Sequence, residues 1–399
     1  MTASPPRTFG LPVLLGVAAG ALVLGLLAGL LAGVAGTSAL FALRQDAGSP
    51  STRPAAQALP EELDRLREFV AETRGLEWRR EVPVEVLPPQ EFEQAFVEGP
   101  PLADSMPDHL PSTLQSLGLV DDAAAVSELL ADDGAAYVDG FYDGRRVVVR
   151  ATGWTPAVEV TVVHELTHAL QDQHFALDRL MTGARMDDET ALAALSVVEG
   201  DASWVEEQYA LEQSGEWNEE LWASYDASQA DIDLPPAVQE MLWAPYNLGW
   251  SFATDLRSIG GHEAVGRAFR HPPTTLEQVW DAQAWFDGDA SVADAVAVAA
   301  PRAPEGTHSL GQGTLGSHLL AMLAAEDEWF TVEDGPLPGW AGDRYVTWAT
   351  ATSTCTAVDV ALDSDTHVTE ALDLLDAWLG DGGAASAEGT LLSLQRCVA

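Results

Sequence analysis

The chain contains the stretch His164-Glu165-Leu166-Thr167-His168 in the middle of a long apolar run. If the stretch is helical, both histidines lie on one face, where their imidazoles reach the same tetrahedral zinc ion. Glu165 then points about a quarter turn away, where a base can take a proton from a metal-bound water. The stretch therefore predicts a zinc site with His164 and His168 as ligands and Glu165 as general base.

The residues on both sides of the motif favour a buried helix. Apolar side chains lead into it and continue beyond it, at Val158, Val160, Val162, Val163, Leu166, Ala169 and Leu170. Their spacing predicts a helix from about Pro156 to Gln173. Imidazoles inside such a helix need polar partners, so a structural alternative stays open. In that alternative, backbone groups or carboxylates satisfy two core histidines without any metal.

Two residues compete to be the third zinc ligand. His174 follows His168 at the spacing HExxHxxGxxH, but Gln171 stands where that pattern has the glycine that turns the chain. Without the glycine, the helix would carry His174 away from the metal. Glu199 falls in the apolar stripe of a second expected helix, beside Gly200, which would let two helices approach closely. A carboxylate facing the core needs a partner, so we expect Glu199 to bind zinc; a buried salt bridge to an arginine is the alternative.

The segments HELTHALQDQHF and VVEGDA resemble the gluzincin-type zinc metallopeptidases, and more narrowly a group of exported prokaryotic metallopeptidase-like surface proteins. Shorter segments with a weaker likeness follow the order in which they occur in that group: Gly140–Tyr142, Ala244–Gly249, Pro272–Gln278 and Gly342–Tyr345. Taken together, the resemblance covers roughly residues 61 to 350. The resemblance implies a predominantly helical, zincin-like α+β fold. It also implies that His164, His168 and Glu199 hold the zinc, that Glu165 is the base and that the substrate is a peptide or protein.

An Asp-Gly pair, Asp143-Gly144, separates two strand-like runs just before the expected zinc helix. The runs are Tyr137–Tyr142 and Arg145–Arg150, and this arrangement predicts a β-hairpin beside that helix. One strand could hold an extended peptide by backbone hydrogen bonds along the active-site cleft. A purely structural role for the hairpin stays equally open.

A zinc peptidase also needs a hydrogen-bond donor for the oxyanion that develops on the attacked carbonyl. Tyr246 has a context similar to that group of proteins and is the expected donor, while the alternatives are His262, His308 and His318. Asp172, one turn beyond His168, is either a hydrogen-bond partner of that imidazole or a solvated residue at the helix end.

The amino-terminal region predicts an attachment to the membrane. Residues 9–43 carry no charged side chain and are rich in Leu, Ala, Val and Gly. About 20 such residues span a bilayer as a helix, whereas a signal-peptide core needs only about 7 to 15. We therefore expect residues 1–8 to be a cytoplasmic end and 9–43 an uncleaved anchor, with cleavage after Ala39 and secretion as the alternative. Glycines at GxxxG spacing between Gly16 and Gly33 favour weak pairing of two anchors.

Composition and patterning divide the remainder of the chain. Residues 44–60, rich in Ser, Pro, Ala and Gln, are expected to be a flexible linker. Residues 61–335 are expected to form the zincin-like metallopeptidase domain, starting with a helix over Glu61–Arg80, and 336–399 a small α+β appendage. The strands expected in the appendage are 345–352, 354–362 and 390–398, with a helix over 368–379. Its Cys355 and Cys397 are expected to form a disulfide, and two cysteines are too few for a thiolate zinc site.

The chain is strongly acidic, with 19 basic residues, all arginine, against 62 acidic ones and a formal net charge of -43. This charge argues against nucleic acid as a partner. The sequence thus predicts a membrane-anchored, extracytoplasmic zinc-dependent peptidase. Two alternatives are a catalytically inactive surface or adhesion module that retains the zinc-protease fold, and a structural protein with an accidental motif. The presence of Glu165 favours the enzyme, because zinc binding requires the histidines but not the base.

The acidity is either an adaptation to a high-salt habitat or a means of keeping the protein soluble. The two explanations differ in how the stability of the fold should depend on salt. If it is an adaptation, self-repulsion weakens the folded state in dilute buffer and is screened at 1 M salt, where the Debye length is about 3 Å. The free energy of unfolding, measured by chemical denaturation, should then rise between dilute buffer and molar salt. A flat dependence would exclude the high-salt explanation.

Overall fold

The computed structural model describes residues 53–98, 107–132, 138–181, 189–229, 234–292, 294–324, 335–380 and 383–399. The expected membrane anchor, its cleavage site and its GxxxG glycines lie outside the described residues. Within the described ranges, every helix is too short or too polar to cross a bilayer.

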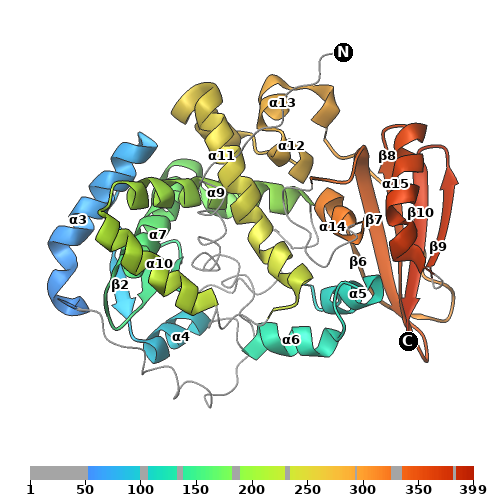
Figure 1. The fold of residues 1–399 in the computed structure, drawn as a ribbon, viewed down its shortest axis with the longest axis horizontal. Coiled ribbons are helices and arrows are strands. Elements are labelled where there is room, and N and C mark those ends of the chain that lie inside the picture. Colours follow the sequence, from blue (N-terminus) through green and yellow to red (C-terminus); the bar gives the residue numbers. More distant parts are fainter. Residues whose placement is uncertain are drawn as a thin grey trace.

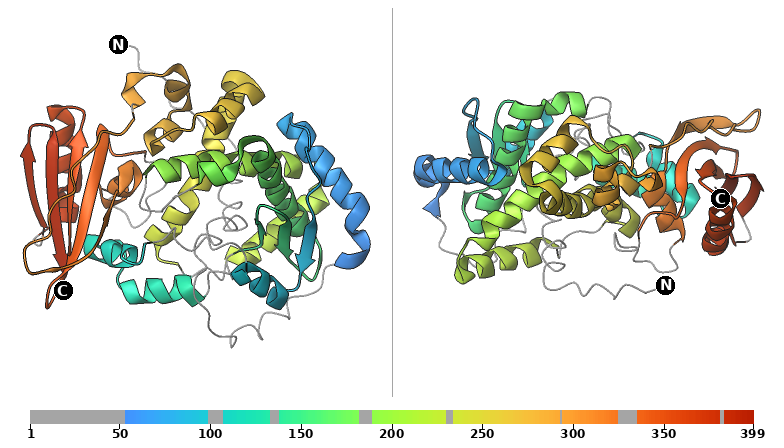
Figure 2. Two further views of the ribbon diagram at one scale, coloured as in Figure 1. Left: turned by 180° about the vertical axis from the view of Figure 1, so that it is seen from behind. Right: turned by 90° about the horizontal axis from the view of Figure 1, so that it is seen from above.

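The expected α+β class with a predominance of helices is confirmed. Helices form most of the molecule, and a five-stranded sheet lies at one end, opposite helix α3 (Ala55–Arg74), in all three views of Figures 1 and 2. The shorter helices include α4 (Pro89–Glu98), α5 (Leu110–Leu117), α6 (Ala123–Asp132), α10 (Gly215–Gln229), α12 (Leu276–Trp280), α13 (Ala282–Asp287), α14 (Gly316–Ala324) and a 3-10 turn at Ala290–Val292. A short strand pair joins β1 (Arg53–Pro54) to β5 (Gly153–Trp154).

The motif helix is α7 (Pro156–Phe175), which is two residues longer at its carboxyl end than the sequence predicts. Its first turn is set by Pro156 and by the Thr155 side chain, which accepts a hydrogen bond from the Val158 amide. Every residue of the helix from 160 to 171 is buried. The imidazoles of the motif therefore lie in the interior, away from bulk water.

Helix α9 (Glu189–Leu211) packs on α7 and crosses α11 (Pro236–Arg270) near the middle of the molecule (Figure 1). The two helices touch through glycine, because a β-carbon on Gly200 would lie only 1.9 Å from the carbonyl carbon of Gly249. A β-carbon on Gly249 would likewise lie 2.1 Å from the carbonyl oxygen of Ser196. The expectation that Gly200 permits a close helix approach is confirmed.

The expected hairpin beside α7 is present. Strand β3 (Gly140–Tyr142) pairs antiparallel with β4 (Val147–Arg150) around a turn in which Gly144 has a φ of +83° and the Asp143 carboxylate accepts two backbone amide hydrogen bonds. Strand β2 (Val84–Leu87) adds in parallel to β4, which gives the order β2-β4-β3. Strand β3 is thus an edge of this sheet. A β-carbon on Gly140 would lie 3.1 Å from Cγ of Glu165, so the edge runs against the motif helix.

The carboxyl-terminal sheet has the order β6-β7-β8-β10-β9 and is antiparallel throughout. Its strands are β6 (His308–Gly313), β7 (Trp340–Ala349), β8 (Thr354–Leu362), β9 (Gly383–Glu388) and β10 (Leu391–Val398). Helix α15 (Asp365–Leu379) packs against it. Cys355 and Cys397 face each other across β8 and β10 and form the expected disulfide. Because β6 precedes residue 336, the sheet includes a strand from the expected peptidase domain; the domain boundary itself stays a prediction.

The first helix differs from its expected bounds. Helix α3 ends at Arg74 rather than at Arg80, because Gly75 takes up a φ of +61° and turns the chain. Beyond the turn, the amides of Arg79 and Arg80 bond to the Gln173 side chain on α7. At its other end α3 begins at Ala55, so the last part of the segment expected to be a linker is helical.

The contact between α9 and α11 generates a stability prediction. Alanine normally favours a helix over glycine by about 1 kcal/mol, but at Gly200 the added methyl group would overlap the backbone of α11. We expect Gly200→Ala to lower the free energy of unfolding by about 1–3 kcal/mol in denaturant titrations. Gly215→Ala is the matched control, because Gly215 lies on α10 with nothing within 4 Å of its added methyl group. Equal stability of the two variants would contradict the close contact.

Candidate metal centre

Three buried side chains from two helices converge on one point. The Nε2 atoms of His164 and His168 on α7 lie 3.0 Å apart, and Oε2 of Glu199 on α9 lies 3.3 and 3.4 Å from them. Ligand atoms held tetrahedrally at about 2.0–2.1 Å from zinc stand roughly 3.3–3.4 Å from one another. The two distances to Glu199 match this spacing, and the distance between the two imidazole nitrogens is slightly shorter. The expected grouping of these residues is present.

Hydrogen bonds at the far side of each ring fix how the two imidazoles point. Nδ1 of His164 lies 3.1 Å from a carboxylate oxygen of Glu206, and Nδ1 of His168 lies 3.0 Å from the amide oxygen of Gln171. Both oxygens only accept, so each Nδ1 would carry the hydrogen of a neutral ring. Both Nε2 atoms are then left with lone pairs directed at the same point, which is the tautomer that a metal ligand needs.

The partner of His168 is itself held by a buried ion cluster. The Gln171 amide nitrogen donates to the carbonyl oxygen of Val198 at 3.1 Å and to Asp201 at 2.9 Å. Asp201 in turn pairs with Arg74 at 2.7 Å and with Arg257 at 2.6 Å. Burial alone would raise the pKa of Asp201, but the two arginines hold it below its usual range. The donors to Asp201 come from α3, α7 and α11, so this cluster ties these helices to α9.

The centre contains several carboxyl groups. Neutral imidazoles carry no positive charge that could balance these groups when they are ionised. Burial alone would lower the pKa of His164, but its hydrogen bonds to Glu199 and Glu206 raise it to about 10. For Glu199, burial raises the pKa, and His168 and His164 outweigh this and lower it. Without a metal, an additional proton on the His164 ring would balance the carboxylates beside it. A divalent cation supplies the same positive charge.

Glu199 forms its ion pairs with the two histidines; among the described residues it has none with an arginine. The alternative of a buried salt bridge between Glu199 and an arginine is therefore wrong. His174 is not part of the group either, because α7 stays helical through Gln171. The Nε2 atom of His174 bonds instead to the carbonyl oxygen of Glu77 at 2.8 Å.

Glu165 is 3% exposed and adjoins the group. Its Oε2 atom has no hydrogen-bond partner among the described residues. A buried polar atom without a partner costs free energy, and such atoms are rare in folded proteins unless a ligand, water or ion satisfies them. The carboxyl group of Glu165 is thus available for a molecule that enters the site.

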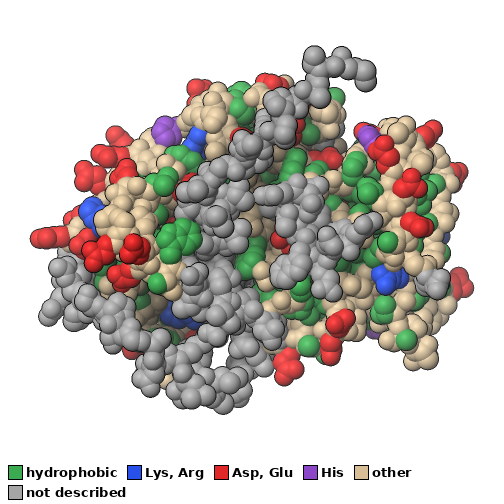
Figure 3. Space-filling view, viewed as in Figure 1, with side chains coloured by type: hydrophobic (Ala, Val, Ile, Leu, Met, Phe, Trp, Pro, Cys, Tyr) green, Lys and Arg blue, Asp and Glu red, His purple; other side chains and the backbone are tan. Residues whose placement is uncertain are grey.

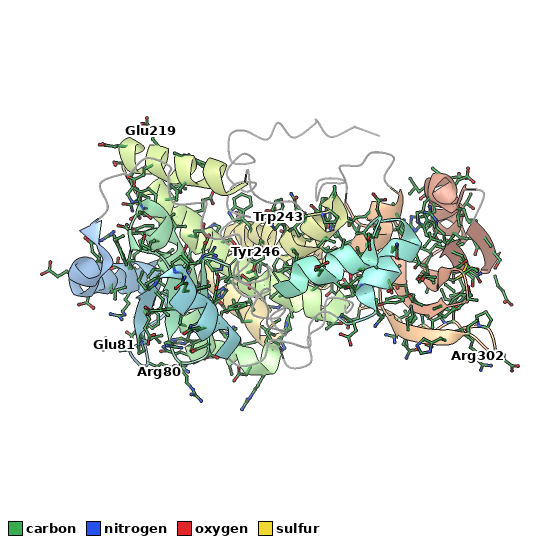
Figure 4. All side chains as sticks on the ribbon, turned by 90° about the horizontal axis from the view of Figure 1, so that it is seen from below. Arg80, Glu81, Glu219, Trp243, Tyr246 and Arg302 are labelled. Carbon is green, nitrogen blue, oxygen red and sulfur yellow. A yellow bond between two sulfur atoms is a disulfide. The ribbon has the colours of Figure 1, made fainter. Side chains whose placement is uncertain are left out.

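Tyr246 comes from the third helix, α11, and its ring centroid lies 6.5 Å from that of His164. Figure 4 shows Tyr246 and Trp243 near the centre of the molecule, on the same helix. Of the alternatives to Tyr246, His262 lines a separate cleft, His308 begins β6 and His318 lies 3.4 Å from Glu240.

Sequence patterns did not identify the residues that orient the ligands. Asp172, considered as a partner of His168, accepts instead from the Tyr142 hydroxyl and from the Leu177 amide. Gln171 takes the role at His168. The sequence does contain a signal for Glu206, since this residue follows Glu199 by two helical turns on the same face of α9. No comparable sequence signal points to Arg74, because this residue is distant in sequence from the residues it supports.

No family model matches the chain, and neither the curated proteins nor the solved structures include a match. The likeness to zinc metallopeptidases therefore rests on the motif residues, together with the arrangement of His164, His168 and Glu199.

We expect the purified protein to bind one zinc ion per chain, because three ligand atoms converge at a single point. Replacement of His164, His168 or Glu199 by Ala should remove the metal, as measured by elemental analysis after gel filtration. His174→Ala is the matched control and should keep full occupancy. The ligand assignment would have to change if His174→Ala lost the metal and Glu199→Ala kept it.

Proposed function

We propose that this protein is a membrane-anchored, zinc-dependent peptidase whose catalytic residues lie outside the cytoplasm. The carrying observation is the buried group of His164, His168 and Glu199, with ligand atoms at zinc-compatible distances and the carboxyl group of Glu165 beside them. Zinc, when bound, lowers the pKa of a coordinated water to about 7 and polarises a carbonyl oxygen. The residues of the chain supply the remaining functions.

Glu165 is the proposed general base. Its unpartnered Oε2 atom can accept a proton from the attacking water and later deliver it to the departing amine. A protein that used this site only for binding or adhesion would have no need of this carboxyl group, whose burial costs stability. This supports the enzyme over an inactive surface or adhesion module that retains the fold.

Tyr246 is the proposed donor to the oxyanion. Its helix, α11, is held close to α9 by the glycine contact, and its ring lies beside that of the ligand His164. A phenolic hydroxyl in a site shielded from water stabilises developing negative charge more strongly than one in solution.

The proposed substrate is a peptide or protein segment in extended conformation. Strand β3 is an edge of its sheet and runs against the motif helix, where Gly140 leaves no side chain between the strand and Glu165. A substrate strand that added to this edge by backbone hydrogen bonds would pass close to the general base. The edge position supports a substrate-binding role over a purely structural one.

The proposed location outside the cytoplasm rests on the disulfide and on the amino-terminal sequence. The disulfide between Cys355 and Cys397 is typical of proteins that fold in an oxidising compartment outside the cytoplasm. The uncharged residues 9–43 would tether the protein to the membrane, and secretion after cleavage is the alternative. Pairing of two anchors through their glycines stays a prediction.

Glu165→Gln separates catalysis from metal binding. The amide cannot accept the proton, so we expect hydrolysis of a peptide library, followed by mass spectrometry, to fall by at least about 100-fold while the zinc content stays at one per chain. Glu219→Gln makes the same chemical change at an exposed residue far from Tyr246 (Figure 4) and should leave both quantities unchanged. Retention of full activity by Glu165→Gln would refute the proposed role of this residue.

A further inference from the structure

Arginines gather on one cleft of this otherwise acidic protein. The cleft has a volume of about 720 Å³ and is lined by Arg74, Arg79, Arg179 and Arg270, with Glu263 as its one acidic residue. Acidic residues outnumber arginines 62 to 19 in the whole chain, and acidic side chains are scattered over the face shown in Figure 3. The composition of the cleft is therefore the reverse of that of the chain.

Three separate parts of the fold build this cleft. Arg79 follows the carboxyl end of α3, Arg179 lies on α8 (Leu177–Leu180) and Arg270 ends α11. Between them, Phe175 and Phe269 stack with ring centroids 4.5 Å apart and form part of an apolar wall. The cleft thus combines cationic groups from different directions with an apolar surface.

The charges of three of these arginines are not compensated by carboxylates among the described residues. Arg74 is paired with Asp201, but the Arg79 guanidinium bonds to a neutral group, the carbonyl oxygen of Gln173, at 2.5 Å. Within the same described ranges, the Arg179 and Arg270 side chains form neither a hydrogen bond nor an ion pair. Elsewhere arginines do pair with carboxylates, as at Arg65, Arg67, Arg146 and Arg150.

We propose that this cleft binds a small anionic molecule in which a carboxylate or phosphate group is attached to an apolar body. Guanidinium groups bind both oxyanions through paired hydrogen bonds, and Arg179 and Arg270 use none of theirs on the described part of the chain. The wall formed by Phe175 and Phe269 takes the apolar body. A polyanion such as nucleic acid is disfavoured, because the net charge of -43 repels many like charges, whereas one or two charges gain more from the local arginines.

This inference does not rest on the proposed peptidase activity. None of the three candidate ligands lines the cleft, and neither does Glu165. The two sites meet at Arg74, which lines the cleft and pairs with the Asp201 that supports Gln171. Binding of the anion should therefore be the same in Glu199→Gln, whether or not that variant retains metal.

Isothermal titration calorimetry at fixed ionic strength tests the site, in a chloride buffer free of phosphate, sulfate and EDTA. The probes are phenyl phosphate, hippurate, inorganic phosphate and the neutral compound benzamide. We expect saturable binding of one molecule of phenyl phosphate or hippurate, tighter than inorganic phosphate, and none of benzamide. The comparison of the first two shows whether phosphate or carboxylate is preferred. Absence of saturable binding by both of them, or equal binding of benzamide, would overturn the proposal.

Variants of two exposed arginines test whether these side chains bind the anion. Arg179→Gln and Arg270→Gln should each weaken binding of the preferred probe by at least about 10-fold, because each removes charge-assisted hydrogen bonds. Arg302→Gln makes the same change in net charge at an exposed position, at the opposite end of Figure 4 from Arg80, and should leave the affinity unchanged. Equal weakening by all three variants would mean that the effect is general electrostatics and that no such site exists.

Discussion

The structure depends on the compensation of charge in the interior between α7 and α9. Two imidazoles and the carboxyl groups of Glu165, Glu199 and Glu206 lie there almost entirely out of water. Ionised groups in such surroundings are stable only when opposite charges and hydrogen bonds satisfy them. A divalent cation between His164 and His168 would meet this requirement, because the Nε2 atoms of both rings and a carboxylate oxygen of Glu199 converge there.

The scaffold around the centre serves the same requirement. Asp201, with its two arginines, anchors Gln171 and so fixes the ring of His168, while Glu206 fixes that of His164. The glycine contact between α9 and α11 brings Tyr246 to the site, and the edge strand β3 approaches it from the side of Glu165. The groups to which we assign metal binding, proton transfer and oxyanion stabilisation thus come from separate elements, and the packing of a few helices aligns them.

Much of the centre was predictable from the sequence because its determinants are local. The spacing of His164 and His168 places them on one helical face, and Glu199 stands out as a carboxylate in an apolar stripe next to a glycine. The Asp143-Gly144 turn and the cysteine pair also have short-range or compositional patterns. Arg74, Asp201 and the arginine cleft depend on contacts between distant segments, which no periodicity encodes. Strands β6 and β9 were missed because they are rich in Gly, Ala and Ser, which have little preference for strands.

The most direct test of the account is anomalous X-ray diffraction at the zinc absorption edge from crystals of the protein. The account predicts one strong anomalous peak at about 2.0–2.2 Å from Nε2 of His164, Nε2 of His168 and a carboxylate oxygen of Glu199. A zinc-loaded crystal with no peak between these three side chains, or with the ion bound at His174 instead, would contradict it.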